Sequence, residues 1–456
     1  MFFKGMMMLL AGKASRFLLL FLCLMLLGTG LARAGKMDRL YFNEFLRLTE
    51  TSAFWKDIDF IKELDAQIQL LAYDGLAPHH YSLADLQTLE AILSTEGILP
   101  FDQRYEVAAS YLEALADLHY GPTLLAGLEP YLIYPEGKKS LVVDPGRILN
   151  MALSGLENPA DAFDLARPQY LPYQQLRAAY QFSLSPQWAM AAVPVALSDE
   201  QYFKIQINLE RFRRLSHMVS DQLLLVDIAG AELALYDGEA KPIVRQSSQI
   251  GRIDRQTPLL WSEITHITVN PSWTVPPTVY REDILPQIRR NQRFLEENQM
   301  QVLNFDGQPM NPALINWRNP GRILLRQAPG DQNELGQIVV RFPNNEAIFL
   351  HDTPSQSYFS QPVRALSSGC IRLQEAPALA RWLLAVSNTD QVDRLEGLLS
   401  SGATQELFLD RSIPVLLAYW TVEVDAEMGL HFRPDIYELD TPMLDFFKDR
   451  VVLAGR

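Results

Sequence analysis

"DQLLLVDIAGAELALYDGEAKPIVRQSSQIG", residues 221–251, decides the fold class of the C-terminal half of the chain. The stretch holds apolar runs of strand length, and Asp237-Gly238 between two of them is a strong signal for a hairpin turn. Similar runs recur further along, in "ITHITVNPSW" (264–273), "GQIVVRFPNNEAIFLHDT" (336–353) and "IPVLLAYWTVEVDAEMGLHFRPDIY" (413–437). The pattern predicts a mainly β domain, folded as an antiparallel sheet or a sandwich.

The N-terminal half has the periodicity of helices instead. In "SAFWKDIDFIKELDAQIQLLAYDGL" (52–76) apolar residues recur at helical spacing, and the run stops at Asp74-Gly75, a C-cap signal. "SLADLQTLEAILS" (82–94) opens with Ser82 as a candidate N-cap before another amphipathic run. These stretches hold no cluster of candidate catalytic side chains. They predict an all-α domain ahead of the β domain.

One segment interrupts the β pattern. "REDILPQIRRNQRFLEENQM" (281–300) is helical and charged, so we expect an insertion at about 276–320. The insertion is either a lid over a site or a surface helix, and its sequence does not decide between the two. The expected fold class is therefore α+β. The predicted divisions are an all-α domain at 35–204, a mainly β, sandwich-like domain at 205–445 and a C-terminal tail at 446–456.

The first 34 residues, "MFFKGMMMLLAGKASRFLLLFLCLMLLGTGLARA", have the features of a signal peptide. A basic start precedes the apolar run Phe17 to Leu27, which is short for a membrane span, and Ala32-Arg33-Ala34 is a small-x-small cleavage site. We expect cleavage after Ala34 and export to the periplasm. An uncleaved N-terminal anchor is the alternative interpretation.

Composition limits the function and singles out one thiol. The chain has 456 residues and a net charge of −14, and an acidic balance without basic clusters argues against nucleic acid as a partner. Of the two cysteines, Cys23 lies in the predicted signal peptide, which leaves Cys370 alone. One cysteine cannot form an internal disulfide, so Cys370 is either an inert buried side chain or a reactive group. The count does not decide between them.

The residues before Cys370 favour the reactive interpretation. A cysteine nucleophile needs a base, and His351 at the end of the apolar run "AIFL" is the side chain best suited to take a proton near neutral pH. Ser367-Ser368-Gly369 forms a small-residue turn in which backbone N–H groups can converge on an oxyanion. Arg372 can grip a carboxylate bidentately. The alternatives without a catalytic role are a histidine whose hydrogen bonds are satisfied within the fold, a turn with only a structural function, and an ion pair between Arg372 and Glu375.

The sequence "HDTPSQSYFSQPVRALSSGCIRL" (351–373) resembles the signature of the L,D-transpeptidases with a YkuD-type catalytic domain. That signature is a histidine, about fifteen residues, then Ser-His-Gly-Cys and a hydrophobic-Arg pair. The chain is similar to the large periplasmic branch of the family over nearly its whole mature length, which implies that 35–204 is a scaffold domain. Further similar stretches are "GLAPHHY" (75–81), "INLERFRRL" (207–215), "GRIDRQTPLLWSEI" (251–264), "NPSWTVPPTVYREDILP" (270–286), "RQAPGDQNELG" (326–336) and "FRPDIY" (432–437).

The resemblance implies a role for each matching residue. Cys370 is the expected nucleophile and His351 the expected general base and acid, with its other ring nitrogen held by the backbone carbonyl of Asp352. Gly369, through its N–H group together with that of Cys370, is expected to form the oxyanion hole. Arg372 is the expected substrate carboxylate contact, and Ser367 a local hydrogen-bond partner.

Two positions differ from the pattern or carry less support. Ser368 stands where the family has a histidine, so any substrate or oxyanion role there is open, because serine cannot titrate. Trp273 in "NPSWTVPP" is a candidate for lining a substrate groove, with packing as the equal alternative, and Trp317 is a weaker candidate. No histidine cluster has metal-ligand spacing. We expect no metal and no cofactor.

The implied function is a peptidoglycan L,D-transpeptidase. Cys370 would attack the bond between diaminopimelate and the terminal D-Ala of a tetrapeptide stem, and a second stem peptide would resolve the thioester into a 3→3 cross-link. The same site could act as an L,D-carboxypeptidase or attach or release a lipoprotein, and an inactive wall-binding scaffold is the rival of another class. Peptidoglycan synthases and carboxypeptidases are further candidate partners.

Overall fold

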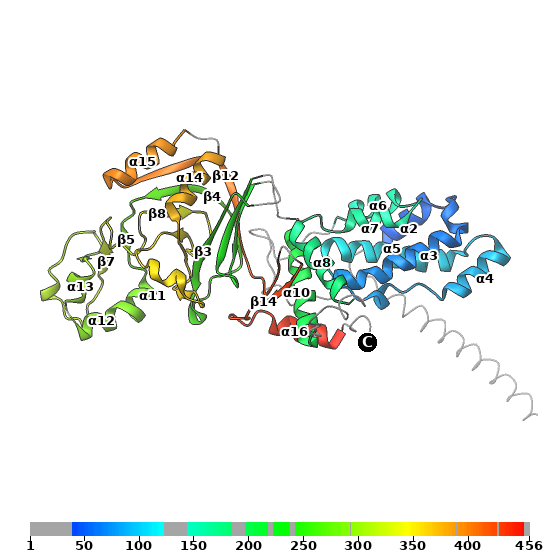
Figure 1. The fold of residues 1–456 in the computed structure, drawn as a ribbon, viewed down its shortest axis with the longest axis horizontal. Helices are drawn as coiled ribbons and strands as arrows, with labels where there is room; N and C mark the ends of the chain where they lie inside the picture. Colours follow the sequence, from blue (N-terminus) through cyan, green and yellow to red (C-terminus); the bar gives the residue numbers. More distant parts are fainter. Residues whose placement is uncertain are drawn as a thin grey trace, which may run out of the picture. The chain divides into compact units, whose positions relative to one another are not determined.

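The computed structural model describes residues 39–122, 144–184, 197–217, 222–237, 242–291, 293–387, 390–425 and 428–450 (Figure 1). The predicted signal peptide lies outside the described residues, as does the end of the predicted tail beyond 450. Contacts divide the chain into two compact units, and each is described by itself. The described part of the first unit is 39–122 and 144–168, and that of the second begins at Gln169.

The first unit is helical throughout its described residues. Its elements are α2 (Arg39–Leu48), η1 (Ala53–Lys56), α3 (Ile58–Leu70), η2 (Leu71–Asp74), η3 (Pro78–Tyr81), α4 (Leu86–Glu96), α5 (Phe101–Tyr120), α6 (Pro145–Ser154) and α7 (Pro159–Ala166). Gly75 ends η2 in the left-handed conformation, as the C-cap signal predicts. The predicted N-cap Ser82 is wrong. Asp85 caps α4 by accepting from Thr88 N–H, because its carboxylate stands directly before the first turn, whereas Ser82 Oγ donates to His79 O.

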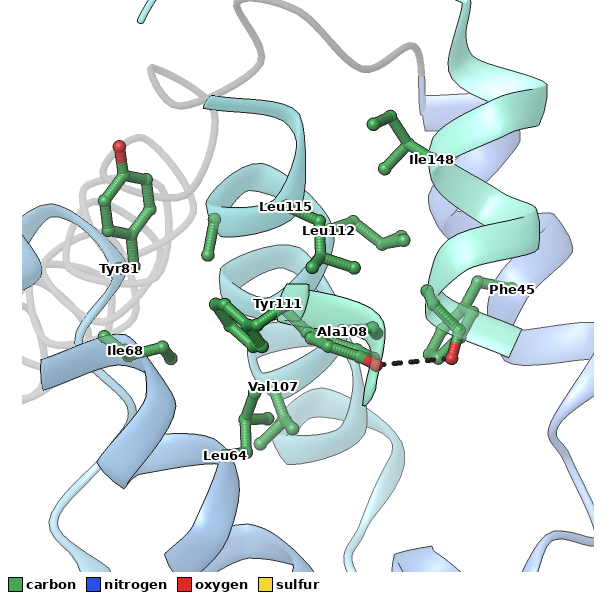
Figure 2. Packing of buried hydrophobic residues seen from close by; sticks show 14 of the residues in the cluster. Phe45, Leu64, Ile68, Tyr81, Val107, Ala108, Tyr111, Leu112, Leu115 and Ile148 are labelled. Carbon is green, nitrogen blue, oxygen red and sulfur yellow. Dashed lines mark hydrogen bonds between the residues drawn. The ribbon is translucent and has the colours of Figure 1, made fainter. Parts of the chain in front are cut away.

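The helical unit has its own apolar core. Figure 2 shows Tyr111 of α5 among the labelled core side chains, and Tyr111 is 1% exposed. Its hydroxyl donates to the carbonyl of Ala152 on α6 at 3.3 Å, so the one polar atom that this ring buries is satisfied. The amphipathic runs of the sequence therefore form a packed domain.

The second unit is built on one mixed sheet. Its strands are β1 (Gln222–Asp227), β2 (Glu232–Asp237), β3 (Val244–Gly251), β4 (Leu260–Val269), β8 (Ile338–Arg341), β9 (Leu350–His351), β10 (Ala365–Ser367), β11 (Ile371–Leu373) and β12 (Gln405–Ala418). Their order is β10-β3-β11-β9-β8-β4-β12-β1-β2, and β2 also pairs with β3, so the pairings close into a ring. β2 and β3 are antiparallel across the predicted Asp237-Gly238 turn, although Gly238 itself lies outside the described residues.

The inside of the ring is apolar and its outside is partly covered by helices. Alternate residues of the strands, such as Val340, Leu350 and Ile371, form the core together with α14 (Ala376–Val386). α8 (Leu171–Ser183) and α10 (Asp199–Leu215) pack on the outward side chains of β1 and β12. These two helices belong to the second unit, whereas the sequence analysis places most of their residues in the helical domain that ends at 204.

The second unit also contains a hairpin, two further helices and a small second sheet. β13 (Val422–Val424) and β14 (Leu430–Phe432) form a hairpin, and α15 (Val392–Ser401) packs with α14. α16 (Thr441–Arg450) runs across the predicted domain end at 445. A small three-stranded sheet forms from β5 (Trp273–Thr274), β6 (Met300–Leu303) and β7 (Leu324–Gln327).

The predicted insertion is a small subdomain with its own core. Between its strands lie the short helices α11 (Pro277–Val279), η7 (Tyr280–Ile284), α12 (Leu285–Arg290), α13 (Phe294–Glu297) and η8 (Pro312–Leu314). Ile288 and Leu325 are buried in its apolar cluster. The α+β class, with helices first and a mainly β domain after them, is confirmed. None of the described helices combines the length and apolar character needed to cross a bilayer.

Candidate active site

The predicted catalytic residues share the outer face of the ring. β11 pairs with β9 in parallel, with Ile371 beside Leu350 and Arg372 beside His351. Because side chains alternate along a strand, Ile371 and Leu350 point into the core while Cys370, Arg372 and His351 point outward. The pairing therefore makes Cys370 and His351 diagonal neighbours on one surface.

His351 is held in the tautomer that a general base needs. Its Nδ1 lies 2.6 Å from the backbone carbonyl of Asp352, and a carbonyl only accepts, so Nδ1 carries the hydrogen and Nε2 is left to take a proton. The carbonyl contact expected from the resemblance is therefore present. Burial, with the charges of Arg372 and Arg341, lowers the pKa of His351 to about 3, and the ring is neutral.

The carboxylate of Asp352 fixes the backbone that holds this histidine. Asp352 Oδ2 accepts from Gln337 N–H at 2.9 Å. Gly336 has φ +56, and a Cβ there would lie 2.3 Å from Asp352 Oδ2, so only glycine allows this close approach. A residue larger than glycine at 336 would push Asp352 away and disturb the bond to the imidazole.

Cys370 is partly exposed and protonated. Burial raises the pKa of its thiol above the ordinary value, and the backbone at Phe349 and the charges of Arg341 and Arg372 oppose that rise. Its Sγ lies 3.9 Å from the carbonyl of Ala347. A protonated thiol and a neutral imidazole thus occupy diagonal positions on one face of the paired strands.

The turn before the thiol is fixed by hydrogen bonds. Ser367 Oγ donates to the carbonyl of Cys370 and accepts from Gly369 N–H at 3.2 Å. Thr257 Oγ1 donates to the carbonyl of Gly369 at 2.8 Å. Gly369 has φ +109, a conformation that favours glycine. Ser367 thus has the local role expected of it.

The bond between Gly369 and Ser367 corrects one expectation. The N–H of Gly369 is engaged by Ser367 and is not free to hold an oxyanion in this conformation. The N–H of Cys370 is the donor that remains from the predicted pair. Gly369 contributes the turn, because its backbone conformation brings Ser367 and Cys370 together.

Ser368 has a role that its sequence position does not reveal. Its Oγ accepts from Arg255 Nη1 at 3.0 Å and from Arg252 Nη1 at 3.4 Å. Both arginines also bind Asp283 in the insertion, at 2.6 and 3.1 Å, and Arg255 reaches Glu282 as well. Ser368 therefore ties the catalytic turn to the insertion, which puts the 276–320 segment beside the site.

We expect Arg255 and Asp283 to be energetically coupled. In a double-mutant cycle with Arg255→Gln and Asp283→Asn, the coupling free energy of unfolding should be about 1 kcal/mol, because the pair is part of a network and Arg255 is largely buried. The exposed pair Arg293–Glu297 in the same insertion is the control and should show no measurable coupling. Equal coupling in the two cycles would contradict the prediction.

Arg372 is partly exposed beside His351 and binds an internal carboxylate. Its Nη2 lies 3.3 Å from Glu334 Oε2, in the loop before β8. The Arg372–Glu375 pair that the sequence left open is not the contact that the structure shows. Arg372 therefore reaches toward the loop at 328–336 and away from the helix that follows β11.

A second cation flanks the thiol and was missed from sequence. Arg341 ends β8, and its guanidinium lies over the ring of Phe349, 4.7 Å from the centroid. Continuing the register of β8 and β9 puts Phe349 between Arg341 and Cys370. The alternation of side chains along a strand could have indicated it, since Arg341 falls on the same outward face as His351 once β8 and β9 are paired.

The two tryptophans belong to the insertion. Trp273 lies in β5 and packs partly buried against the apolar cluster of the insertion, and Trp317 is in that cluster, with Nε1 donating to Pro312 O. No described contact joins Trp273 to Cys370, and its role in lining a substrate groove stays a prediction. Among the residues that the structure describes, no group of three or more His, Cys, Asp or Glu side chains could hold a metal ion.

The two pKa shifts predict an unusual pH profile for the thiol. We expect the rate of Cys370 alkylation by iodoacetamide in the folded protein to rise continuously from pH 6 to above 9, because the thiol pKa is raised above its ordinary value and the thiolate fraction still increases across this range. No inflection should occur near pH 6.5, because His351 is already neutral there. A reactive plateau between pH 5 and 8 would contradict this and indicate an imidazolium–thiolate pair. Stopped-flow or mass-spectrometric alkylation across pH measures the profile.

Comparison with known proteins identifies both parts of the chain. Residues 221–394 match a family model described as the YkuD L,D-transpeptidase catalytic domain, and residues 42–179 match one described as a Scaffold domain. A Haemophilus influenzae protein named "Putative L,D-transpeptidase" is 30% identical over 254 residues, which cover 54% of this chain and 50% of that protein. The chain thus spans about half the length of the curated relative it matches.

One solved structure, titled "Structure of the Ldtfm-avibactam carbamoyl enzyme", is similar at 12% identity over 44% of this chain and 49% of that one. Its TM-score of 0.22 is too low to support an argument. The assignment of the two domains rests on the two family models. Residues 221–394, which include His351, Cys370 and Arg372, therefore form a YkuD L,D-transpeptidase catalytic domain, and a Scaffold domain at 42–179 precedes it.

Proposed function

We propose that the protein is a peptidoglycan L,D-transpeptidase that forms 3→3 cross-links through a thioester on Cys370. One observation carries the proposal. His351 donates through Nδ1 to the carbonyl of Asp352, which leaves Nε2 as a base on the same sheet face as the partly exposed thiol. Such a pair suits acyl transfer from an amide.

The proposed first half-reaction transfers one acyl group and one proton. The Cys370 proton passes to His351 Nε2 as sulfur attacks the carbonyl of diaminopimelate in the donor stem. The Cys370 N–H stabilises the oxyanion, the bond to D-Ala breaks, and His351 returns the proton to the leaving amine. In the second half-reaction the side-chain amine of an acceptor diaminopimelate attacks the thioester and loses a proton to His351. That proton returns to the sulfur as the cross-link forms.

The environment of His351 supports this division of labour. Its pKa is lowered, so the imidazole is neutral in the resting protein and its Nε2 is available to accept a proton. The incoming scissile carbonyl and its oxyanion donor lower the cost of forming the thiolate during attack. Arg372 and Arg341 flank the sulfur on the outer face and offer charges for carboxylates of the substrate.

The proposal is tested with the purified mature protein and a disaccharide-tetrapeptide containing diaminopimelate. A Cys370-dependent acyl adduct, followed by a dimer that has lost D-Ala, is the expected result by intact-protein and product mass spectrometry. An adduct that releases only tripeptide would indicate a carboxypeptidase. An adduct resolved only by a lipoprotein lysine would indicate an attachment enzyme. No adduct, together with a thiol inert to iodoacetamide, would leave a wall-binding scaffold.

We also propose that the reaction takes place in the periplasm, after removal of residues 1–34. The basic start, the short apolar run and the Ala32-Arg33-Ala34 site support this location. Cell fractionation, combined with N-terminal sequencing of the mature protein, tests it. A membrane-bound protein that retains its first residues would favour the uncleaved anchor.

A further inference from the structure

A buried glutamine beside Arg372 has no hydrogen-bond partner for its side chain. Gln249 lies on β3 directly opposite Arg372 on β11, so both side chains project from the outer face. Gln249 is fully buried, and neither its Oε1 nor its Nε2 finds a partner among the described residues. η9 (Gln356–Ser360) packs on β3. Buried amides are nearly always satisfied, so this one calls for a functional explanation.

Arg372 shows the same pattern one strand away. Its Nε is buried without a partner among the described residues, although its Nη2 binds Glu334. Gln249 and Arg372 thus present an unsatisfied acceptor and unsatisfied donors at neighbouring positions. His351 flanks Arg372 on the other side, which places this group of atoms at the edge of the catalytic pair.

The loop that carries Glu334, the partner of Arg372, is held by hydrogen bonds. Its loop is fixed by Asn333, which is 2% exposed and whose side chain donates to the carbonyls of Pro271 and Ala328 and accepts from Leu335 N–H. Glu334 N–H itself donates to Gln327 Oε1 at 2.9 Å. The backbone from which the Glu334 side chain projects is therefore anchored within the loop.

We infer that Gln249, Arg372 and Glu334 form a subsite for an amino-acid head group, a carbon that bears both an ammonium and a carboxylate. Arg372 offers paired N–H donors to the carboxylate, Glu334 accepts from the ammonium, and the Gln249 amide can donate to one and accept from the other. A purely anionic ligand would be repelled by Glu334, and a purely cationic one by Arg372. The zwitterion is the class that satisfies all three side chains.

If the proposed function is taken as given, the position of the subsite determines which group of the substrate enters it. Arg372 is two residues from Cys370 along one strand, a distance of about 6–7 Å. In diaminopimelate, three methylene groups separate the carbonyl-bearing centre from the second centre, which carries an ammonium and a carboxylate. With the scissile carbonyl at Cys370, this second centre of the donor reaches Arg372, so the subsite selects diaminopimelate over other third residues.

Three synthetic tetrapeptide stems test the effect of each charge of the head group on its own. They differ only in the third residue, which is diaminopimelate (both charges), lysine (ammonium only) or norleucine (neither). We expect the wild type to prefer diaminopimelate over lysine, and lysine over norleucine, each by about tenfold or more in kcat/KM for D-Ala release. Gln249→Met should reduce the first preference to within about threefold, and Glu334→Gln should do the same to the second.

Gln246→Met is the matched control. Gln246 is buried on the same strand, but its amide is satisfied by the backbone of Glu375. It should lose thermal stability and keep both preferences, whereas Gln249→Met should keep or raise its Tm, because it replaces an unpartnered amide. If Gln249→Met and Glu334→Gln both keep the wild-type preferences among the three stems, the proposal of the subsite is wrong. A wild type that acylates none of the stems would instead overturn the proposed function. If Gln249→Met does not fold, the half-exposed Glu334 decides alone.

Discussion

Cys370→Ala will abolish acyl-enzyme formation and D-Ala release completely. Cys370 is the only cysteine among the described residues, and its sulfur lies on the outer sheet face diagonal to His351, so no other thiol can replace it. Alanine removes the atom that would form the thioester and changes little else, because the side chain is partly exposed. Intact-protein mass spectrometry after incubation with a tetrapeptide stem measures the loss.

Cys370→Ser is the companion to that variant. Serine keeps the shape of the side chain, but its hydroxyl is a far weaker nucleophile without a stronger base, and His351 has a low pKa. We expect it to be as inactive as alanine within the assay. Both variants should unfold within about 1 kcal/mol of the wild type, since neither opens a buried cavity. Residual D-Ala release by Cys370→Ala would mean that the nucleophile lies elsewhere.

His351→Asn will slow acylation by about 10²–10⁴-fold. An asparagine amide can still donate to the carbonyl of Asp352, but it has no nitrogen that takes a proton from the thiol. The matched control is His266→Gln. His266 lies on β4 next to Arg341, on the same outer face, stacks on Phe408 and is not part of the proposed machinery. Its acylation rate should stay within about threefold of the wild-type rate, and an equal loss in both variants would contradict the assignment.

The same substitution should change the acid stability of the protein. The pKa of His351 is lowered in the folded state, from 6.5 to about 3, so the unfolded chain binds an extra proton between those values. The contribution of the neutral, buried imidazole to the free energy of unfolding is complete above pH 6.5. It is lost as the pH falls toward 3, at up to about 1.4 kcal/mol per pH unit. His351→Asn should therefore flatten the dependence of unfolding free energy on pH in that window. Urea melts at several pH values measure it, and an unchanged slope would contradict the burial of a neutral imidazole.

Much of the site could be predicted from one stretch of sequence. The stretch 351–373 contains His351, the serine-glycine turn, Cys370 and Arg372. Strand pairing brings its two ends together, so that His351, Cys370 and Arg372 lie on one face of the sheet. The Asp352 carbonyl contact was implied by the family resemblance, and it joins residues that are adjacent in the chain. The N-cap of α4 shows the limit of local reasoning, since the sequence analysis places it at Ser82 and the turn geometry places it three residues later, at Asp85.

Other features depended on residues far apart in sequence. Arg252 and Arg255 bind Ser368 from a segment more than one hundred residues away and also bind Asp283, and no periodicity predicts such a meeting. Arg341 and Glu334 reach the catalytic strands through pairing and loop packing. The engagement of Gly369 N–H by Ser367 depends on the exact geometry of the turn, which residue types alone do not fix.

The sequence by itself determined the α+β fold class and pointed to His351 and Cys370 as the candidate reactive pair, because apolar periodicity and a short motif are local properties of the chain. The tertiary structure alone decided which charges surround that pair and that the sheet closes on itself. It also decided that a buried, unpartnered Gln249 lies beside Arg372. Strand register sets these contacts, and register arises from pairings between residues that are distant along the chain.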